Sequence, residues 1–218
     1  MAIQMHSAEA TMSFLLGLRA RGVLDTATLK AFERVSRTEF VGHRYADLVH
    51  EDIALPIPCG QTQSSPSAIA RMLSALGATS GDRILEIGTG SGYATALLSQ
   101  VGLSVITLER FRTLADAALT RFQRLGLSNI RVLHADGARG LAEDGPFDRI
   151  LIHASIEGDH EPLLEQLTPG GALVGVLRAG HVTELTRWRR GEGNRSVEMD
   201  HFGRLDLPLL SKGISEAL

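Results

Sequence analysis

The chain has 218 residues, of which 44% are hydrophobic; this suffices for one α/β domain with an appended segment, whereas two full domains would be crowded. Lysines and arginines number 22 against 25 aspartates and glutamates, so the net charge is -3 and no broad basic face for a nucleic-acid backbone is expected. A single cysteine, Cys59, excludes an intrachain disulfide and a cysteine-based zinc site, and no signal peptide or membrane-spanning apolar run is found, so we expect a cytoplasmic protein.

Two amphipathic helices are predicted near the N-terminus, at residues 7–19 and 25–35, and Asp25 is a suitable N-cap for the second. The segment 37–65 then loses periodicity and collects prolines and glycines. It is longer than an ordinary connection, which marks it as functional or disordered. Because it holds too many apolar residues for a tail, we expect it to be functional.

From residue 66 onward, short apolar runs alternate with longer amphipathic stretches. A helix capped by Ser65 is predicted over 66–76. The elements expected after it are strands at 84–87, 105–108, 130–133 and 150–152, and helices at 94–101, 114–125 and 162–167. Such alternation is typical of a doubly wound, Rossmann-like α/β sheet of parallel strands with helices on both faces.

The pattern changes at the end of the chain. Residues 166–171 are predicted to close a helix, and the strands expected after them are closely spaced, at 173–177, 183–188 and 197–205. A hairpin turn is predicted at 191–194. The last strands of the sheet should therefore be antiparallel.

The turn after the first core strand carries three glycines whose spacing restricts the ligand. Gly88 lets the chain turn tightly, and Gly90 lets the backbone approach a ligand. Gly92 lets the next helix pack closely. A dinucleotide fingerprint has two residues between its second and third glycines, whereas only Ser91 stands here, and Tyr93 occupies the expected glycine or alanine position. No lysine follows, so a P-loop is excluded as well.

Carboxylates at the strand ends indicate which cofactor the turn holds. Glu86, at the loop entrance, would repel a pyrophosphate but attract the ammonium and sulfonium groups of S-adenosylmethionine. Glu109, 17 residues beyond Gly92, is placed to accept hydrogen bonds from both ribose hydroxyls. Asp136 is expected to accept from the adenine amino group while the Gly137 amide donates to a ring nitrogen. The predicted cofactor site comprises Glu86, Gly88, Thr89, Gly90, Ser91, Gly92, Glu109, Arg110, Asp136 and Gly137.

With these residues laid out, the chain from about residue 15 to its C-terminus resembles protein-L-isoaspartate O-methyltransferases. The specific block, which general methyltransferases lack, consists of Val35-Ser36-Arg37, Tyr45, Leu55-Pro56-Ile57, Gly60-Gln61-Thr62, Ser64 and Pro66. The glycine loop and four later motifs also match in order and spacing: Glu109, Asp136-Gly137, Pro146-Phe147-Asp148 and residues 166–171. The chain departs from the family pattern at Ser36, Pro58, Gln63, His153-Ala154-Ser155 and Gly175-Val176-Leu177.

The resemblance implies methyl transfer from S-adenosylmethionine to the free carboxylate of L-isoaspartyl residues in damaged proteins, which initiates their repair. It implies that Thr62 and Ser64 face that carboxylate and that the C-terminal strands help cover the peptide. A carboxylate with a reference pKa near 4 is already the nucleophile at neutral pH, so no general base is required. Hydroxyls suit the acceptor better than arginine, because strong donors would stabilise the reactant anion more than the transition state.

The residues leave other functions open. One is a carboxyl methyltransferase for another peptide or small-molecule carboxylate, and another is a binding protein that holds the cofactor without turnover. A nicotinamide oxidoreductase is a remote alternative. Ser64 and Ser65 are also candidate helix caps, Cys59 is interpreted as a packed residue, and His153 as a packed or solvated group near the site.

We expect a single domain in three parts. Residues 1–65 form a helical segment with the substrate loop, 66–178 the cofactor-binding α/β core, and 179–218 the antiparallel strands. The eight histidines show no paired ligand spacing, so no metal is expected. The expected partner is an isoaspartyl-containing peptide or protein, with neither nucleic acid nor membrane involved, and the expected state is a monomer.

Overall fold

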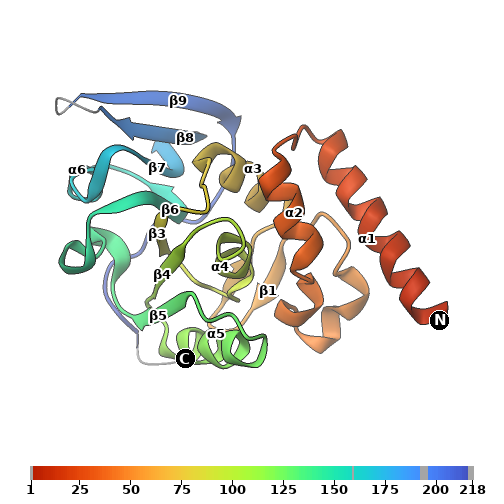
Figure 1. Cartoon of the computed structure of the whole chain (residues 1–218). Coiled ribbons are helices and arrows are strands. Elements are labelled where there is room, and N and C mark those ends of the chain that lie inside the picture. Colours follow the sequence, from red (N-terminus) through yellow and green to blue (C-terminus); the bar gives the residue numbers. More distant parts are fainter. Residues whose placement is uncertain (1, 159, 192–195, 216–218) are drawn as a thin grey trace.

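The computed structural model describes residues 2–158, 160–191 and 196–215 (Figure 1). Its α-helices are α1 (Ala2–Ala20), α2 (Thr26–Arg34), α3 (Pro66–Leu76), α4 (Tyr93–Leu98), α5 (Arg112–Arg124) and α6 (Glu161–Leu164). Its strands are β1 (Leu55–Ile57), β2 (Gln61–Gln63), β3 (Arg83–Ile87), β4 (Ser104–Glu109), β5 (Ile130–His134), β6 (Phe147–Ile156), β7 (Leu167–Ala179), β8 (Val182–Arg190) and β9 (Val197–Arg204). Four 3₁₀ helices complete the described elements: η1 (Arg37–Phe40), η2 (His43–Leu48), η3 (Gly137–Arg139) and η4 (Ala142–Asp144).

The main sheet has the strand order β5-β4-β3-β6-β7-β8-β9. Strands β3 to β7 pair in parallel, and β7, β8 and β9 pair antiparallel. The order reverses between β3 and β6, which is where a doubly wound sheet binds its ligand, beyond the carboxyl ends of the strands. The expected fold class is therefore confirmed, including its antiparallel end.

Alternating residues of the strands send side chains to opposite faces of the sheet and build two cores. Ile84 of β3 belongs to the larger cluster, which also holds buried residues of α2, α3, α4 and α5. Its neighbour Leu85 belongs to the second cluster, which includes Leu163 of α6 and Trp188 of β8. Helices α2 to α5 thus contribute to one core, whereas the four-residue α6 contributes to the other.

The segment after β9 turns back across the sheet toward α5 (Figure 1). Leu209 forms a bridge with Ser155 in β6, and Ser215 forms one with Phe111, just after β4. The Ser155 hydroxyl also donates to the Leu207 carbonyl over 2.6 Å. This C-terminal segment, residues 206–215, therefore crosses the carboxyl ends of β6 and β4.

Most predicted elements are present, with boundaries shifted by a few residues. Asp25 accepts a hydrogen bond from the Thr28 amide over 2.7 Å, and Ser65 accepts one from the Ala68 amide over 3.4 Å, so both predicted caps are confirmed. The prediction that residues 166–171 close a helix is wrong, because β7 already begins at Leu167 in register with Phe147. The hairpin turn predicted at 191–194 extends into residues outside the described ones. No helix in the described part of the chain is long and apolar enough to cross a membrane.

Candidate active site

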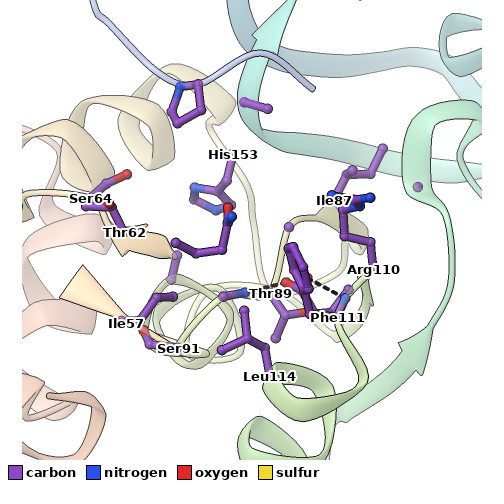
Figure 2. A pocket seen from close by; sticks show the side chains of 18 of the residues that line it. Ile57, Thr62, Ser64, Ile87, Thr89, Ser91, Arg110, Phe111, Leu114 and His153 are labelled. Atoms are coloured by element: carbon purple, nitrogen blue, oxygen red, sulfur yellow. Dashed lines mark hydrogen bonds between the residues drawn. The ribbon is translucent and has the colours of Figure 1, made fainter. Parts of the chain in front are cut away.

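A cavity of about 240 Å³ lies at the switch point of the sheet, beyond the ends of β3, β4 and β6. Three parts of the chain line it: the β1–β2 region with the residues just after it, the strand ends with their loops, and the C-terminal segment. Figure 2 shows Thr62 and Ser64 on one side of the cavity and Arg110 and Phe111 on the other. The fold thus brings together residues separated by up to about two thirds of the chain.

The glycine turn after β3 forms the floor of this cavity. Gly88, Gly90 and Gly92 all have positive φ, at 96°, 54° and 84°. A Cβ on Gly92 would lie 2.6 Å from the ring of Phe122 in α5, so glycine is needed there for packing as well as for backbone conformation. Gly88, Thr89, Gly90 and Ser91 line the cavity, whereas Gly92 does not.

Glu109 lines the cavity from the end of β4 and is fixed by the backbone. Its Oε2 accepts from the Gly90 amide over 2.9 Å, and its Oε1 accepts from the Phe111 amide over 3.0 Å. Each carboxylate oxygen has two lone pairs, so acceptor capacity remains for a ligand. This geometry fits the expected role toward a pair of hydroxyl donors.

Glu86 lies behind the cavity wall and is not among the lining residues, and its expected role toward the cofactor stays a prediction. Its carboxylate is fully buried; Oε2 accepts from the hydroxyls of Thr95 over 2.5 Å and Thr107 over 2.6 Å. Its Oε1 lies 3.0 Å from Nε2 of His153, which does line the cavity. The physical reason is the strand period: Glu86 shares the face of Ile84, under α4, and His153 stands between its carboxylate and the cavity.

Asp136 and Arg110 contact the C-terminal segment. Asp136 accepts from the amides of Ala138 over 2.9 Å and Gly213 over 2.7 Å, and it does not line the cavity. Arg110 lines the cavity, but its Nε donates to the Gly213 carbonyl over 2.9 Å. Asp136 thus contacts backbone from residue 213, and its expected contact with adenine stays a prediction. Gly137 lines the cavity as expected.

Thr62 and Ser64 flank a buried residue, Gln63, on the opposite wall. Both residues line the cavity, and neither hydroxyl has a hydrogen-bond partner in the described part of the chain. Gln63 points inward; its Oε1 accepts from Arg37 Nε over 2.7 Å, and its Nε2 donates to the Ser91 hydroxyl over 2.8 Å. The two flanking hydroxyls are therefore free to bind a ligand while the residue between them is fixed.

Arg37 holds the long segment before β2 in place. Its guanidinium is buried and donates to the carbonyls of Val49, Glu51 and Ile53, over 3.4, 2.9 and 2.8 Å. Burial lowers the pKa of this group from its ordinary value, while Tyr93 and Asp52 act in the opposite direction. Because arginine normally titrates above about 12, it remains a cation, and the segment predicted as functional is ordered around this charge.

Several cavity residues were not predicted. Phe111 and Leu114 follow β4, and Pro208, Leu209 and Leu210 come from the C-terminal segment. Phe111 could have been predicted to line the cavity, because it directly follows Glu109 and Arg110 at the end of β4. The C-terminal residues carry no periodicity, so nothing in the sequence directed them to the cavity.

The reversal of strand order, the glycine turn beside it and the carboxylate at the end of β4 define a Rossmann-like fold of the methyltransferase class. The family model described as Protein-L-isoaspartate(D-aspartate) O-methyltransferase (PCMT) matches residues 9–205. The chain belongs to this family.

Individual relatives agree over most of the chain. It is 47% identical over 212 residues to a protein-L-isoaspartate O-methyltransferase of Paracoccus denitrificans, covering 97% of each chain. It is 49% identical over 167 residues to one of Cereibacter sphaeroides, covering 77% of this chain and 76% of the relative. A solved protein-L-isoaspartate O-methyltransferase aligns with a TM-score of 0.81 at 25% identity, over 92% of this chain and 66% of that one.

A second solved structure supports the fold. It is a Plasmodium falciparum protein, described as a candidate member of the same family and crystallised with S-adenosyl-L-homocysteine. It aligns with a TM-score of 0.76 at 23% identity and covers 92% of this chain and 97% of its own.

Proposed function

We propose that this protein transfers a methyl group from S-adenosylmethionine to the free carboxylate of L-isoaspartyl residues in damaged proteins or peptides. One observation carries the proposal: the unpartnered hydroxyls of Thr62 and Ser64 line the same cavity as the glycine turn and Glu109. These hydroxyls belong to the block that distinguishes the family from general methyltransferases. Family membership supports the same activity.

The donor set of the cavity fits the cofactor. Glu109 offers acceptor capacity to a ribose diol, and Ile87, Leu108 and Phe111 supply apolar surface for a base. Arg110 is the only lysine or arginine among the described residues that line the cavity, and its guanidinium is bonded to the C-terminal segment. A pyrophosphate would therefore find little positive charge here, whereas a cationic ligand finds two carboxylates, one in the wall and one behind it.

The acceptor side needs orientation and no strong acid or base. When bound, S-adenosylmethionine supplies an electrophilic methyl group that a carboxylate oxygen accepts without a proton transfer. Thr62 and Ser64 would donate hydrogen bonds to the carboxylate and fix its direction without neutralising it, because a hydroxyl is a weaker donor than a cation. Alignment of this kind is worth about 7 to 11 kcal/mol in well-oriented reactions.

The test is a methyl-transfer assay with a labelled methyl donor and two peptides that differ only in an isoaspartyl or aspartyl residue. We expect transfer to the isoaspartyl peptide and little to its aspartyl twin. Equal transfer to both would indicate a less specific carboxyl methyltransferase, the alternative prompted by Gln63 and His153. Tight cofactor binding without transfer to either peptide would indicate a binding protein and would contradict the proposal.

The division of the chain follows the same reasoning. We propose that residues 1–65 supply the acceptor side, 66–178 the cofactor-binding core, and 179–218 the cover over both. We further propose a cytoplasmic monomer that acts on polypeptides and on neither nucleic acid nor membranes. The net charge of -3 supports the exclusion of nucleic acid. Size-exclusion chromatography with light scattering measures the oligomeric state.

A further inference from the structure

His153 is a titratable side chain in the cavity wall to which the mechanism above gives no task. It lies in β6 beside β3, and Figure 2 shows its ring pointing into the cavity. Its side chain is 10% exposed.

The buried carboxylate of Glu86 holds this ring in one orientation. Nε2 of His153 lies 3.0 Å from Oε1 of Glu86, while Oε2 is already bonded to Thr95 and Thr107. In the tautomer that carries its proton on Nε2, the ring donates to this carboxylate oxygen. The other ring nitrogen, Nδ1, is then the site where the neutral and charged forms differ.

Nδ1 has no hydrogen-bond partner in the described part of the chain. In the neutral ring it offers a lone pair to the cavity, and in the charged ring an N–H with a positive charge. The other ionised groups that face the cavity are Glu109, bonded to two backbone amides, and Arg110, bonded to the C-terminal segment. Glu86 lies directly behind the ring. Among the described residues that line the cavity, His153 is therefore the one whose two protonation states offer a ligand opposite hydrogen-bonding groups at Nδ1.

We propose that His153 is a positioning residue for the cofactor: its neutral ring accepts a hydrogen bond at Nδ1 from the ammonium group of the ligand, and protonation at Nδ1 weakens cofactor binding. The inference rests on the proposed function but concerns binding, which is measurable without turnover. Protonation replaces an acceptor with a donor and places two like charges close together. Cofactor affinity should therefore fall as pH falls.

The test is isothermal titration calorimetry of the full-length, ligand-free protein with S-adenosylhomocysteine and with S-adenosylmethionine, between about pH 8 and pH 5.5. H153Q keeps an amide donor that can reach Glu86 but has no titrating ring. H201Q is the matched control, because His201 on β9 also pairs with a carboxylate, Glu184, at 3.3 Å, and is 44% exposed. Circular dichroism checks that each variant is folded.

We expect the wild type and H201Q to lose affinity about tenfold from pH 8 to pH 5.5, because a single protonation opposes binding. H153Q should show a weaker affinity at pH 8 and little pH dependence. Calorimetry in buffers of different ionisation enthalpy gives a second readout: at the acid end of this pH range, binding should release protons in the wild type and not in H153Q.

Two results would overturn the proposal. One is an equal pH dependence of affinity in H153Q and the wild type. The other is an unchanged affinity in H153Q with a raised KM for the isoaspartyl peptide, which would assign the ring to the acceptor and leave the proposed function intact. Failure of the proposed function has a different signature, because the pH-dependent binding would then persist without methyl transfer to the peptide.

Discussion

The side-chain amide of Gln63 donates a 2.8 Å hydrogen bond to the hydroxyl of Ser91, which joins the wall of the cavity that carries Thr62 and Ser64 to the glycine turn. The Ser91 oxygen also accepts from the Tyr93 amide over 3.3 Å. Both of its lone pairs are then engaged, so its own O–H is left to donate, and Ser91 lines the cavity. Gln63 thus fixes the direction of a donor on the cofactor side.

Replacing Gln63 should therefore affect both stability and cofactor binding. Gln63→Leu leaves the Arg37 Nε and the Ser91 hydroxyl without their partner, and we expect unfolding free energy to fall by about 1–3 kcal/mol. Gln63→Glu keeps an acceptor for Arg37 but removes the donor to Ser91, so it should mainly weaken S-adenosylhomocysteine binding. Urea unfolding and calorimetry separate the two effects. Gln123→Leu, at an exposed position of α5, is the control, and wild-type behaviour of both Gln63 variants would refute the coupling.

The sequence predicted the fold and one half of the cavity well. Alternating apolar runs fix the strands because each run must be buried, and the glycine turn and Glu109 lie at strand ends that a parallel sheet brings to one edge. Glu86 shows a limit of motif reading: its place at the loop entrance suggested a ligand contact, but the period of two puts it under α4. Considering the face as well as the position would have predicted this.

The contacts of Asp136 and Arg110 could not be predicted in this way. Their partners, the backbone groups of residues 212 and 213, lie in a segment without helical or strand periodicity. Such a segment is positioned by hydrogen bonds between residues far apart in the chain, which leave no local pattern. The same holds for Arg37 and Gln63, whose pairing spans 26 residues.

Ser64 should be required for turnover and dispensable for cofactor binding. Ser64→Ala removes a cavity hydroxyl that has no partner in the described residues, so we expect a reduced kcat with nearly unchanged affinity for S-adenosylhomocysteine. The neighbouring variant Ser65→Ala is a matched control: it removes the cap of α3 and should lower unfolding free energy by about 1 kcal/mol while kcat is kept. Unchanged turnover in Ser64→Ala would remove this residue from the acceptor site.

The C-terminal segment should slow the release of the cofactor. Asp136→Ala removes the hydrogen bond that the Gly213 amide donates to this side chain over 2.7 Å. Because residues 208–211 of the same segment form part of the cavity wall, that wall should become looser. We expect S-adenosylhomocysteine to dissociate about 3- to 10-fold faster, the equivalent of one hydrogen bond. Stopped-flow fluorescence measures the rate. Asp116→Ala, at an exposed position of α5, should leave it unchanged, and an equal effect of both variants would argue against a specific role for the segment.

Asp200 should stabilise the edge of the sheet in a pH-dependent manner. Two hydrogen bonds from Arg187, at 3.0 and 2.9 Å, lower the pKa of its carboxyl, which is solvent-accessible on β9. Because the pKa of this carboxyl is lower in the folded than in the unfolded chain, its ionised form stabilises the fold at pH values above the unfolded-state pKa. This stabilisation is lost as pH falls through the folded-state pKa. Asp200→Asn should therefore lower Tm at neutral pH and match the wild type in acid. Asp47→Asn, at an exposed position of η2, is the control; a Tm difference that persists in acid would exclude this origin.

Gly92 should be essential for packing, beyond its role in the turn. A Cβ there would lie 2.6 and 2.8 Å from two ring atoms of Phe122, which is 1% exposed and cannot move without disturbing the core. Gly77 offers a comparison, since its φ of 59° is also positive but nothing lies within 4 Å of its Cβ position. Gly77→Ala should cost only backbone strain, about 1–2 kcal/mol, whereas Gly92→Ala should cost about 1–3 kcal/mol more. If the clash is the cause, the double variant Gly92→Ala/Phe122→Leu, in which a smaller side chain replaces the ring, should recover part of the lost stability in urea unfolding. Equal costs at the two glycines would show that backbone strain alone matters.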